Sequence, residues 1–265
     1  MEALIPTLKG KTILITGSTD GVGRMAARRL GEAGALVFIH GRDRQRGEET
    51  VSAIEAAGGE ARFLQADLSS LDETRSLAAA VSQQTERLDV LINNAGIGSG
   101  ASGAPRRTNA AGCELRFAVN YLAGFLLTSL LLPLLKGSAP ARIVNVASAG
   151  QQALDFDDLM LTRGYSGARA YMQSKLAQIL FTLDLARELE GPASPPFACI
   201  RRAIWRRPWC AKPASPRGAA SKTAPRQSLT WRSRRRSRGA AASISTACER
   251  RAPMRKPMTC ARANG

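Results

Sequence analysis

Two hydrophobic periodicities alternate along the first 190 residues of the chain. Short apolar runs typical of buried strands are followed by stretches in which apolar residues recur every three or four positions, as in amphipathic helices. The pattern predicts strands at about 11–15, 35–39, 61–64, 90–92 and 142–146. It predicts helices at about 23–33, 48–57, 71–85, 114–135 and from 168 onward. This alternation implies an α/β fold with a doubly wound parallel sheet, whose ligand lies at the carboxyl ends of the strands.

The first predicted strand runs into the glycine-rich sequence TGSTDGVG. Its glycines follow a strand and open a helix, where backbone can approach a pyrophosphate held at the helix N-terminus. An ordinary turn is the alternative interpretation, but the position between strand and helix favours a nucleotide. The residues expected to bind the nucleotide phosphates are Gly17, Ser18, Thr19, Asp20, Gly21, Val22 and Gly23.

The second predicted strand ends in the tripeptide His-Gly-Arg at 40–42. Sheets that bind NAD usually place an acid near this point for the ribose hydroxyls, whereas an arginine accommodates the 2′-phosphate of NADP. The strand tip carries no acid, because Asp43 comes after Arg42. Arg42 is therefore the expected phosphate contact and NADP(H) the preferred cofactor, with NAD(H) as the other candidate. The alternative for Arg42 is a solvated helix start, and His40, the only histidine, is expected to be a strand-end residue rather than a catalyst.

Tyr171 and Lys175 lie four residues apart in the last predicted helix, so their side chains point the same way. A free phenol titrates at about pH 10 and is a poor acid or base at neutrality. A neighbouring ammonium favours the tyrosinate and moves its pKa toward working pH, where proton transfer is efficient. Alone, this spacing more often reflects packing or a solvated helix face. No metal-ligand spacing is found, so no metal is expected.

Six motifs occur in a characteristic order and spacing over residues 8–191: TGSTDGVG, ADL, NNAG, FAVNYLAGFLLT, RIVNVAS and YMQSK. Together they resemble the short-chain dehydrogenase/reductase family. The resemblance implies an oxidoreductase with a Rossmann-like sheet, a nicotinamide cofactor and a small carbonyl or alcohol substrate. It implies that Tyr171 donates or accepts the proton and that Lys175 lowers its pKa and holds the nicotinamide ribose. It further implies that Ser148 steadies the substrate oxygen and that Asn120 anchors a proton-relay water.

The same resemblance implies further cofactor contacts. Asp67, with Leu68 beside it, is expected at the adenine, and the sequence Asn94-Ala95-Gly96 is expected to border the cofactor. Ser148 precedes Tyr171 by 23 residues, a longer gap than in most of the family. The intervening segment resembles the retinol-dehydrogenase-like branch, which carries such an insertion. Ser166 is a rival by spacing, but it belongs to the insertion, whereas Ser148 follows the strand.

Composition changes abruptly near residue 191. Residues 191–265 contain 18 of the 38 Lys and Arg but only one of the 21 acidic residues, which leaves 20 of each sign before them. They also contain all three Trp and four of the five Cys. The excess charge of +17 therefore belongs to this segment. We predict a catalytic dinucleotide-binding domain at 1–191 and a basic, disordered tail at 192–265, with the last two strands of the sheet missing.

Three interpretations of the tail compete: a nucleic-acid-binding extension, a solvated disordered extension and a region translated in the wrong frame. An Arg-rich run with tryptophans nearby favours nucleic acid, but no folded platform is predicted to hold those aromatics, so a nucleic-acid partner is not expected. When the implied DNA is read two bases later, permissible codons give TGVTAVCLHPAGYMATTMVREAGIAP from residue 191 and GKYFDGLRAARANAQA from 241. Both resemble the missing end of the family fold. A frameshift is therefore the preferred interpretation.

The function predicted from these residues is an NADP(H)-preferring oxidoreductase that interconverts an alcohol and a carbonyl, with doubtful activity in the chain as printed. The alternative is a catalytically inactive nucleotide- or nucleic-acid-binding protein with an Arg-rich tail. The apolar stretch 125–135 is too short to span a bilayer and contains Pro133, so no membrane partner is expected. One cysteine before residue 191 fits a reducing compartment without a disulfide framework, and the expected location is cytoplasmic. A homo-oligomer is expected if the C-terminus is intact.

Overall fold

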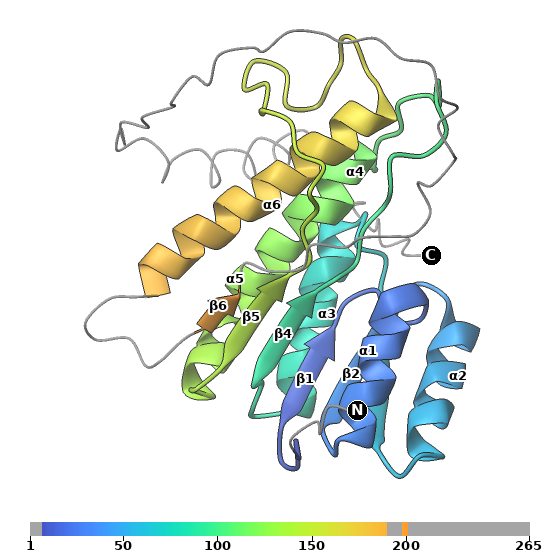
Figure 1. Cartoon of the computed structure of the whole chain (residues 1–265), viewed down its shortest axis with the longest axis vertical. Coiled ribbons are helices and arrows are strands. Elements are labelled where there is room, and N and C mark those ends of the chain that lie inside the picture. Colours follow the sequence, from blue (N-terminus) through green and yellow to red (C-terminus); the bar gives the residue numbers. More distant parts are fainter. Residues whose placement is uncertain (1–6, 190–197, 201–265) are drawn as a thin grey trace, which may run out of the picture.

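The computed structural model describes residues 7–189 and 198–200, and Figure 1 shows them as a sheet flanked by helices. The strands are β1 (Thr12–Ile15), β2 (Leu36–Gly41), β3 (Glu60–Gln65), β4 (Val90–Asn93), β5 (Arg142–Asn145) and β6 (Ala198–Ile200). The helices are α1 (Gly21–Glu32), α2 (Arg44–Glu55), α3 (Leu71–Gln84), α4 (Leu115–Phe117), α5 (Ala123–Gly137) and α6 (Gly167–Leu189), and a π-helical turn, η1 (Ala118–Leu122), joins α4 to α5. The predicted order of strands and helices is confirmed.

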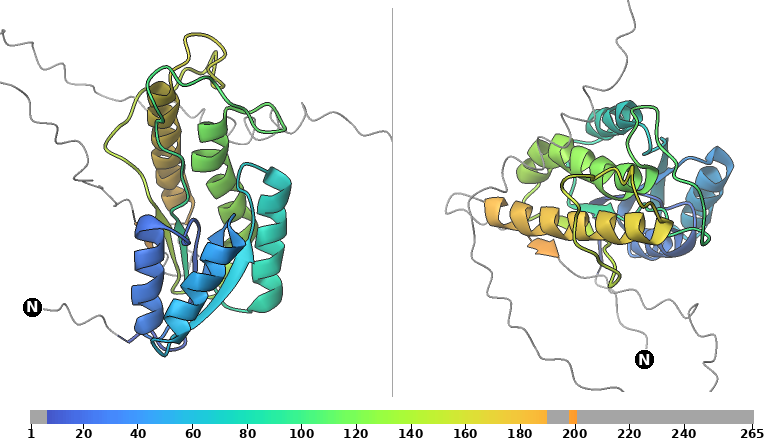
Figure 2. Two further views of the ribbon diagram at one scale, coloured as in Figure 1. Left: turned by 90° about the vertical axis from the view of Figure 1, so that its right-hand side faces the viewer. Right: turned by 90° about the horizontal axis from the view of Figure 1, so that it is seen from above.

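The strands form one parallel sheet in the order β3-β2-β1-β4-β5-β6. This order reverses between β1 and β4, which makes the sheet doubly wound and Rossmann-like. Alternate strand residues are buried on opposite faces. Leu14 and Phe38 pack into the core that α3, α5 and α6 cover, whereas Ile13 and Val37 pack into the core beneath α1 and α2. Figure 2 shows α1 and α3 on opposite sides of the sheet.

A sixth strand corrects the prediction that the sheet lacks its last two strands. β6 pairs in parallel with β5, with Cys199 opposite Ile143. The strand is only three residues long and lies within the segment whose sequence has no clear periodicity. The outer edge of β5 offers free backbone hydrogen-bonding groups. The extended backbone of residues 198–200 pairs with that edge. A seventh strand and the rest of the predicted tail fall outside the described residues.

Two further expectations change with the structure. Cys113 is disulfide-bonded, which corrects the expectation that the chain has no disulfide framework. The apolar stretch 125–135 belongs to a longer continuous helical segment of 23 residues, Leu115–Gly137, which by length and composition alone could cross a membrane. Its most apolar window is 56% buried inside the protein, as expected for a core helix. Leu127 and Leu131 of this segment are fully buried.

Candidate active site

One groove runs along the carboxyl ends of the strands and collects most of the predicted site residues. Its volume is about 1310 Å³, and it spans β1, β2, β4 and β5 and the start of α6. The predicted residues that line it are Gly17, Thr19, Asp20, Gly21, Val22, Gly23, Arg42, Asp67, Leu68, Asn94, Ala95, Gly96, Ser148, Tyr171 and Lys175. Ser18 and Asn120 do not line the groove, because both are buried beneath its wall. The structure therefore brings together residues up to 158 positions apart in sequence, from Gly17 to Lys175.

The glycine-rich turn forms one end of the groove. Gly17 has φ +64° and Gly21 has φ +54°, which are left-handed conformations that favour glycine. A Cβ on Gly23 would collide with the carbonyl oxygen of Gly17 and the side-chain amide of Asn94. Because these three residues have no Cβ, a ligand can approach the backbone closely at the start of α1. Free N–H groups and the helix dipole attract anions there. The turn therefore fits a dinucleotide pyrophosphate.

Ser18 and Asn94 hold the turn in place through side-chain hydrogen bonds. The Ser18 hydroxyl donates to the Ile15 carbonyl oxygen (2.8 Å) and accepts from the His40 backbone N–H (2.9 Å). The Asn94 amide nitrogen donates to the carbonyl oxygens of Thr16 and Gly17, both at 2.9 Å. Ser18 and Asn94 were predicted to lie near the cofactor. In the structure their side chains fix the glycine-rich turn, which is the loop that would bind it.

His40 links the glycine-rich turn to the end of β3. Its Nδ1 accepts from the Gly17 N–H (3.0 Å), so its Nε2 carries the proton and donates to the Ala66 carbonyl oxygen (3.2 Å). The side chain is 2% exposed, and this burial lowers the pKa of His40 to about 4. His40 is therefore neutral at pH 7 and acts as a fixed donor–acceptor bridge. The expectation of a strand-end residue is met in position, but sequence alone did not reveal the bridge.

Acidification should destabilise the fold through His40. The unfolded histidine binds its proton near pH 6.5, whereas the buried one does so only near pH 4. The unfolded state therefore holds more protons between these values, and the free energy of unfolding should fall by up to about 3 kcal/mol as pH drops through this window. Urea unfolding at pH 7 and pH 4.5 measures this. His40→Gln should be less stable than the parent at pH 7 but should lose less stability on acidification; an equal loss in both proteins would contradict the assignment.

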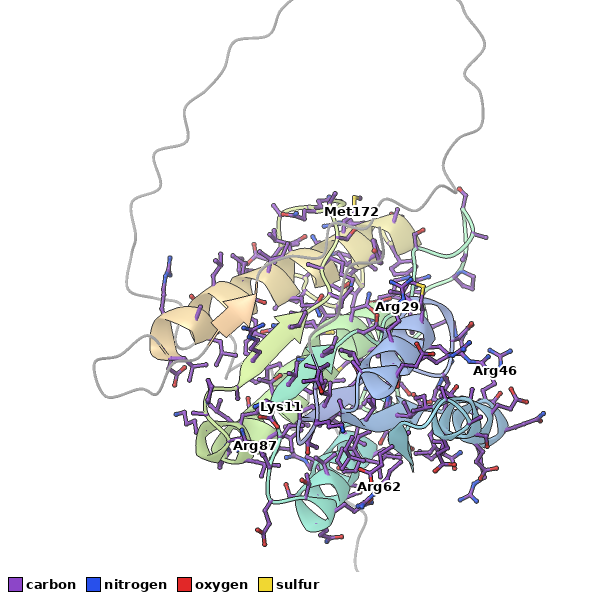
Figure 3. The ribbon with its side chains drawn as sticks, turned by 60° about the horizontal axis from the view of Figure 1, so that its bottom comes forward. Lys11, Arg29, Arg46, Arg62, Arg87 and Met172 are labelled. Carbon is purple, nitrogen blue, oxygen red and sulfur yellow. The ribbon has the colours of Figure 1, made fainter. Side chains whose placement is uncertain are left out.

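Arg42 and Arg46 lie in the groove wall beside the ends of β2 and β3. The Arg42 side chain is 72% exposed and its Nη1 is 3.8 Å from an oxygen of Asp67. Arg46 extends from the first turn of α2 (Figure 3), with its Nη1 3.5 Å from an oxygen of Asp20. Such exposed, loosely paired guanidinium groups cost little to redirect toward a stronger anion. Both are therefore available to a phosphate at the strand tip.

The opposite end of the groove contains Ser148, Tyr171 and Lys175. The Ser148 hydroxyl accepts from the Gly150 N–H (3.1 Å). A Cβ on Gly150 would lie 3.6 Å from the Ser148 oxygen and 3.9 Å from the Tyr171 ring, so the two side chains face the same small space. The predicted serine and the tyrosine thus line the same end of the groove, although they are 23 positions apart in sequence. Ser166, the rival, is outside the groove and its hydroxyl accepts from the Arg169 N–H instead.

Lys175 is 5% exposed, and its ammonium donates to the Val146 carbonyl oxygen (2.7 Å) and to Oε1 of Gln178 (3.1 Å). Burial lowers the pKa of Lys175 to about 8. The ammonium therefore keeps its charge at neutral pH but lies in a largely desolvated position, where a charge acts more strongly on its neighbours. Gln178 was not predicted, although its position one helical turn after Lys175 is a readable signal.

Asn120 lies on the π-helical turn η1 and holds the loop after β4. Its Oδ1 accepts from the Ile97 N–H (2.7 Å), while its Nδ2 donates to the Ile97 carbonyl oxygen (3.1 Å) and to Ser174 Oγ (2.9 Å). Both side-chain polar atoms of Asn120 thus have protein partners. A Cβ on Gly96 would lie 3.3 Å from Asn120 Oδ1 and 3.7 Å from Lys175 Nζ, so glycine keeps this corner open.

Thr16 is a further residue that sequence reasoning missed. Its hydroxyl accepts from the backbone N–H groups of Asn94 and Ala95, both at 3.0 Å. It therefore fixes the β4 loop against the end of β1. In the described part of the chain, no group of His, Cys, Asp and Glu side chains could hold a metal ion.

Comparison with known proteins agrees with this geometry. The family model for short chain dehydrogenases matches residues 11–192. Retinol dehydrogenase 13 of Homo sapiens is 42% identical over 190 residues, which are 70% of this chain and 56% of the human protein. The chain thus spans little more than half the length of that curated relative.

Two solved structures share the fold. A putative uncharacterized protein from Mycobacterium paratuberculosis is 35% identical with a TM-score of 0.64, over 74% of this chain and 68% of that one. A metagenomic short-chain oxidoreductase solved in complex with NADP is 31% identical with a TM-score of 0.57, over 69% of this chain and 78% of that one. The matched family region contains the glycine-rich turn, Asn120, Ser148, Tyr171 and Lys175. This chain belongs to the short-chain dehydrogenase family.

Proposed function

We propose that this protein is an NADP(H)-preferring oxidoreductase that interconverts an alcohol and a carbonyl compound. The observation that carries the proposal is the single groove with a glycine-rich phosphate turn at one end and Ser148, Tyr171 and Lys175 at the other. A dinucleotide would reach from one end to the other. Its nicotinamide supplies or accepts the hydride when bound. The similar short-chain oxidoreductase solved with NADP supports the choice of cofactor class.

The chain's own residues would handle the proton and the substrate oxygen. In the reducing direction the Tyr171 hydroxyl donates a proton to the carbonyl oxygen, and Ser148 Oγ donates a hydrogen bond to the same oxygen. The charged Lys175 lies one helical turn from Tyr171 at the same end of the groove, where it would hold the nicotinamide ribose. The Val146 carbonyl oxygen and Gln178 hold that ammonium in place. In the oxidising direction the same groups act in reverse, with Tyr171 as the base.

Cofactor preference is expected to depend on Arg42. Arg42→Ala should reduce the ratio of kcat/KM for NADPH to that for NADH by about ten- to hundredfold, because a charge-assisted contact to the 2′-phosphate is lost. Gln65 is a useful comparison, since its side chain already donates to the Arg42 carbonyl oxygen at the same strand tip (2.9 Å) without supplying a charge. Gln65→Ala should leave the ratio nearly unchanged. Equal kcat/KM for both cofactors in the parent would refute the preference.

We further propose that the sequence after residue 191 reflects a shifted reading frame, and that activity requires the corrected frame. The support is the agreement of two separate segments on one offset of two bases. The alternative, an inactive protein that binds nucleic acid through its Arg-rich tail, predicts a steep loss of DNA affinity with salt and no NADPH turnover. Measuring the salt dependence of DNA affinity and the rate of NADPH turnover distinguishes the oxidoreductase from the nucleic-acid-binding protein.

A cytoplasmic location, no membrane association and a homo-oligomer also belong to this proposal. Leu130 on α5 and Leu180 on α6 are 41% and 38% exposed, which supports a partner surface on these two helices. Analytical ultracentrifugation of the corrected protein, with and without detergent, tests the oligomeric state. Cell fractionation tests the cytoplasmic location and the absence of membrane association. A monomer, or recovery in the membrane fraction, would contradict them.

A further inference from the structure

A buried ionic cluster lies beside the catalytic end of the groove and has no part in the mechanism above. It consists of Glu114, Arg116 and Tyr165. The side chains of Glu114 and Arg116 are 1% and 8% exposed. Tyr165 comes from the insertion between Ser148 and Tyr171, 49 residues after Arg116. Buried charges of this kind are costly unless they are paired and hydrogen-bonded.

Arg116 satisfies that requirement by binding two separate segments of the groove. Its Nε donates to the Gly98 carbonyl oxygen (2.8 Å) and its Nη2 to the Ser99 carbonyl oxygen (2.9 Å). Its Nη1 donates to the Tyr165 hydroxyl (2.6 Å) and lies 3.5 Å from Oε1 of Glu114. The rigid fork of a guanidinium allows these directed bonds to be made at once. One side chain therefore joins the loop after β4 to the insertion.

Glu114 and Tyr165 complete the cluster. The Tyr165 hydroxyl donates to Oε1 of Glu114 (3.2 Å), and Oε2 of Glu114 accepts from the Phe117 N–H (2.8 Å), which caps the short helix α4. The Glu114 N–H also contacts the sulfur of Met160 in the insertion (3.4 Å). The cluster thus fixes α4, which leads directly into the π-helical turn that carries Asn120.

The two joined segments approach the same part of the groove. Gly98 and Ser99 line it next to Ile97, which Asn120 holds. The insertion ends at Gly167, the first residue of α6, where a Cβ would collide with the Ser99 carbonyl oxygen. Four residues further along the same helix lies Tyr171. The position of the catalytic tyrosine relative to the loop after β4 therefore depends on this contact region.

We infer that Arg116 is a positioning residue: it locks the insertion to the loop at 97–99, so that Tyr171 and the nicotinamide end of the groove keep a fixed relation. Naming that end as the nicotinamide side rests on the proposed function. The mechanical link between the insertion and the loop at 97–99 does not depend on the proposed function. A substitution at Tyr165 should therefore alter the local stability of the backbone at Ile97, although Tyr165 does not bond to that residue.

Hydrogen exchange of the full chain, followed by mass spectrometry, tests the link without requiring activity. Tyr165→Phe removes one hydroxyl and keeps the Glu114–Arg116 pair, so the fold should survive. We expect exchange to accelerate by roughly 5- to 30-fold both in the insertion, at Thr162 and Arg163, and at Ile97. Arg116→Lys keeps the charge but cannot make the forked contacts, and should give the same pattern.

Arg169→Met is the matched control. Arg169 also holds the insertion, through Asp155 (2.9 Å) and the Gly164 carbonyl oxygen (3.4 Å), but it makes no bond to the loop at 97–99. This variant should accelerate exchange in the insertion alone. Acceleration confined to the insertion in Tyr165→Phe, or acceleration at Ile97 in Arg169→Met equal to that in Tyr165→Phe, would overturn the inference.

Ligand affinity then separates this inference from the proposed function. Tyr165→Phe should weaken NADPH binding severalfold but leave adenosine 2′,5′-bisphosphate, which lacks the nicotinamide, unaffected. An equal loss for both ligands would overturn the positioning role. Failure of the parent to bind either ligand would refute the proposed function, while the exchange experiment would still decide the mechanical link.

Discussion

Tyr171→Phe should lower turnover of the frame-corrected protein by roughly 10²–10⁴, because the substitution removes the group that exchanges the proton. The ring should remain in place, since no hydrogen bond of the hydroxyl to the described residues holds it, and the backbone of α6 is unaltered. Cofactor affinity is therefore expected to change little. The measurement is steady-state NADPH oxidation with a panel of aldehydes and ketones, combined with NADPH titration by fluorescence.

Tyr121→Phe is the control for this experiment. Tyr121 is a buried tyrosine on η1 that packs against Phe117 and Phe125, and burial with the nearby Asp184 raises the pKa of its phenol to about 12. It does not line the groove. Its phenylalanine variant should keep turnover close to that of the parent. Near-normal turnover in Tyr171→Phe, with normal cofactor affinity, would remove Tyr171 from the chemistry.

The chain as printed should give no measurable turnover, whereas the same chain with its frame corrected after residue 190 should be active. The residues that form the candidate site up to Lys175 are identical in the two proteins. The two proteins differ after α6. There the family resemblance implies a strand, a turn and a substrate loop, and the printed sequence does not contain the residues expected for them. β6 supplies part of the edge pairing on β5, so loss of the loop is the more severe defect.

Parallel expression of both versions tests this expectation. Thermal unfolding by far-UV circular dichroism should show a higher midpoint for the corrected chain, because a longer buried strand adds apolar burial at the sheet edge. NADPH turnover should appear only in the corrected chain. Normal turnover from the chain as printed would show that the tail serves the enzyme as it stands.

Much of the fold was readable from the sequence because local signals and tertiary structure agree. The buried strands were predicted to within a few residues, and the long helices likewise. The starts of α1 and α2 were placed too late, at 23 and 48 instead of Gly21 and Arg44. Asp20 and Asp43 cap these helices, with the Asp43 carboxylate accepting from the Arg46 N–H (3.1 Å). An aspartate before each helix was a usable N-cap signal.

Other features depend on contacts that no local pattern encodes. β6 has three residues and no periodicity, and it forms because the edge of β5 is available. The His40 bridge requires two strand ends to meet at distances that only the folded sheet defines. Arg116 reads as an ordinary charged residue at the start of a helix until the insertion brings Tyr165 against it. The side-chain contacts of His40 and Arg116 join residues up to 49 positions apart, and the paired residues of β5 and β6 are 56 positions apart.

In the proposed reaction, hydride passes between a nicotinamide cofactor and a carbonyl carbon in this groove. The most direct test is to incubate the frame-corrected protein with NADPH deuterated at nicotinamide C4 and an accepted aldehyde, and to analyse the alcohol by mass spectrometry. Deuterium should appear on the carbinol carbon, and Tyr171→Phe should suppress this product. Saturated NADPH binding without label transfer to any carbonyl substrate tested would contradict it.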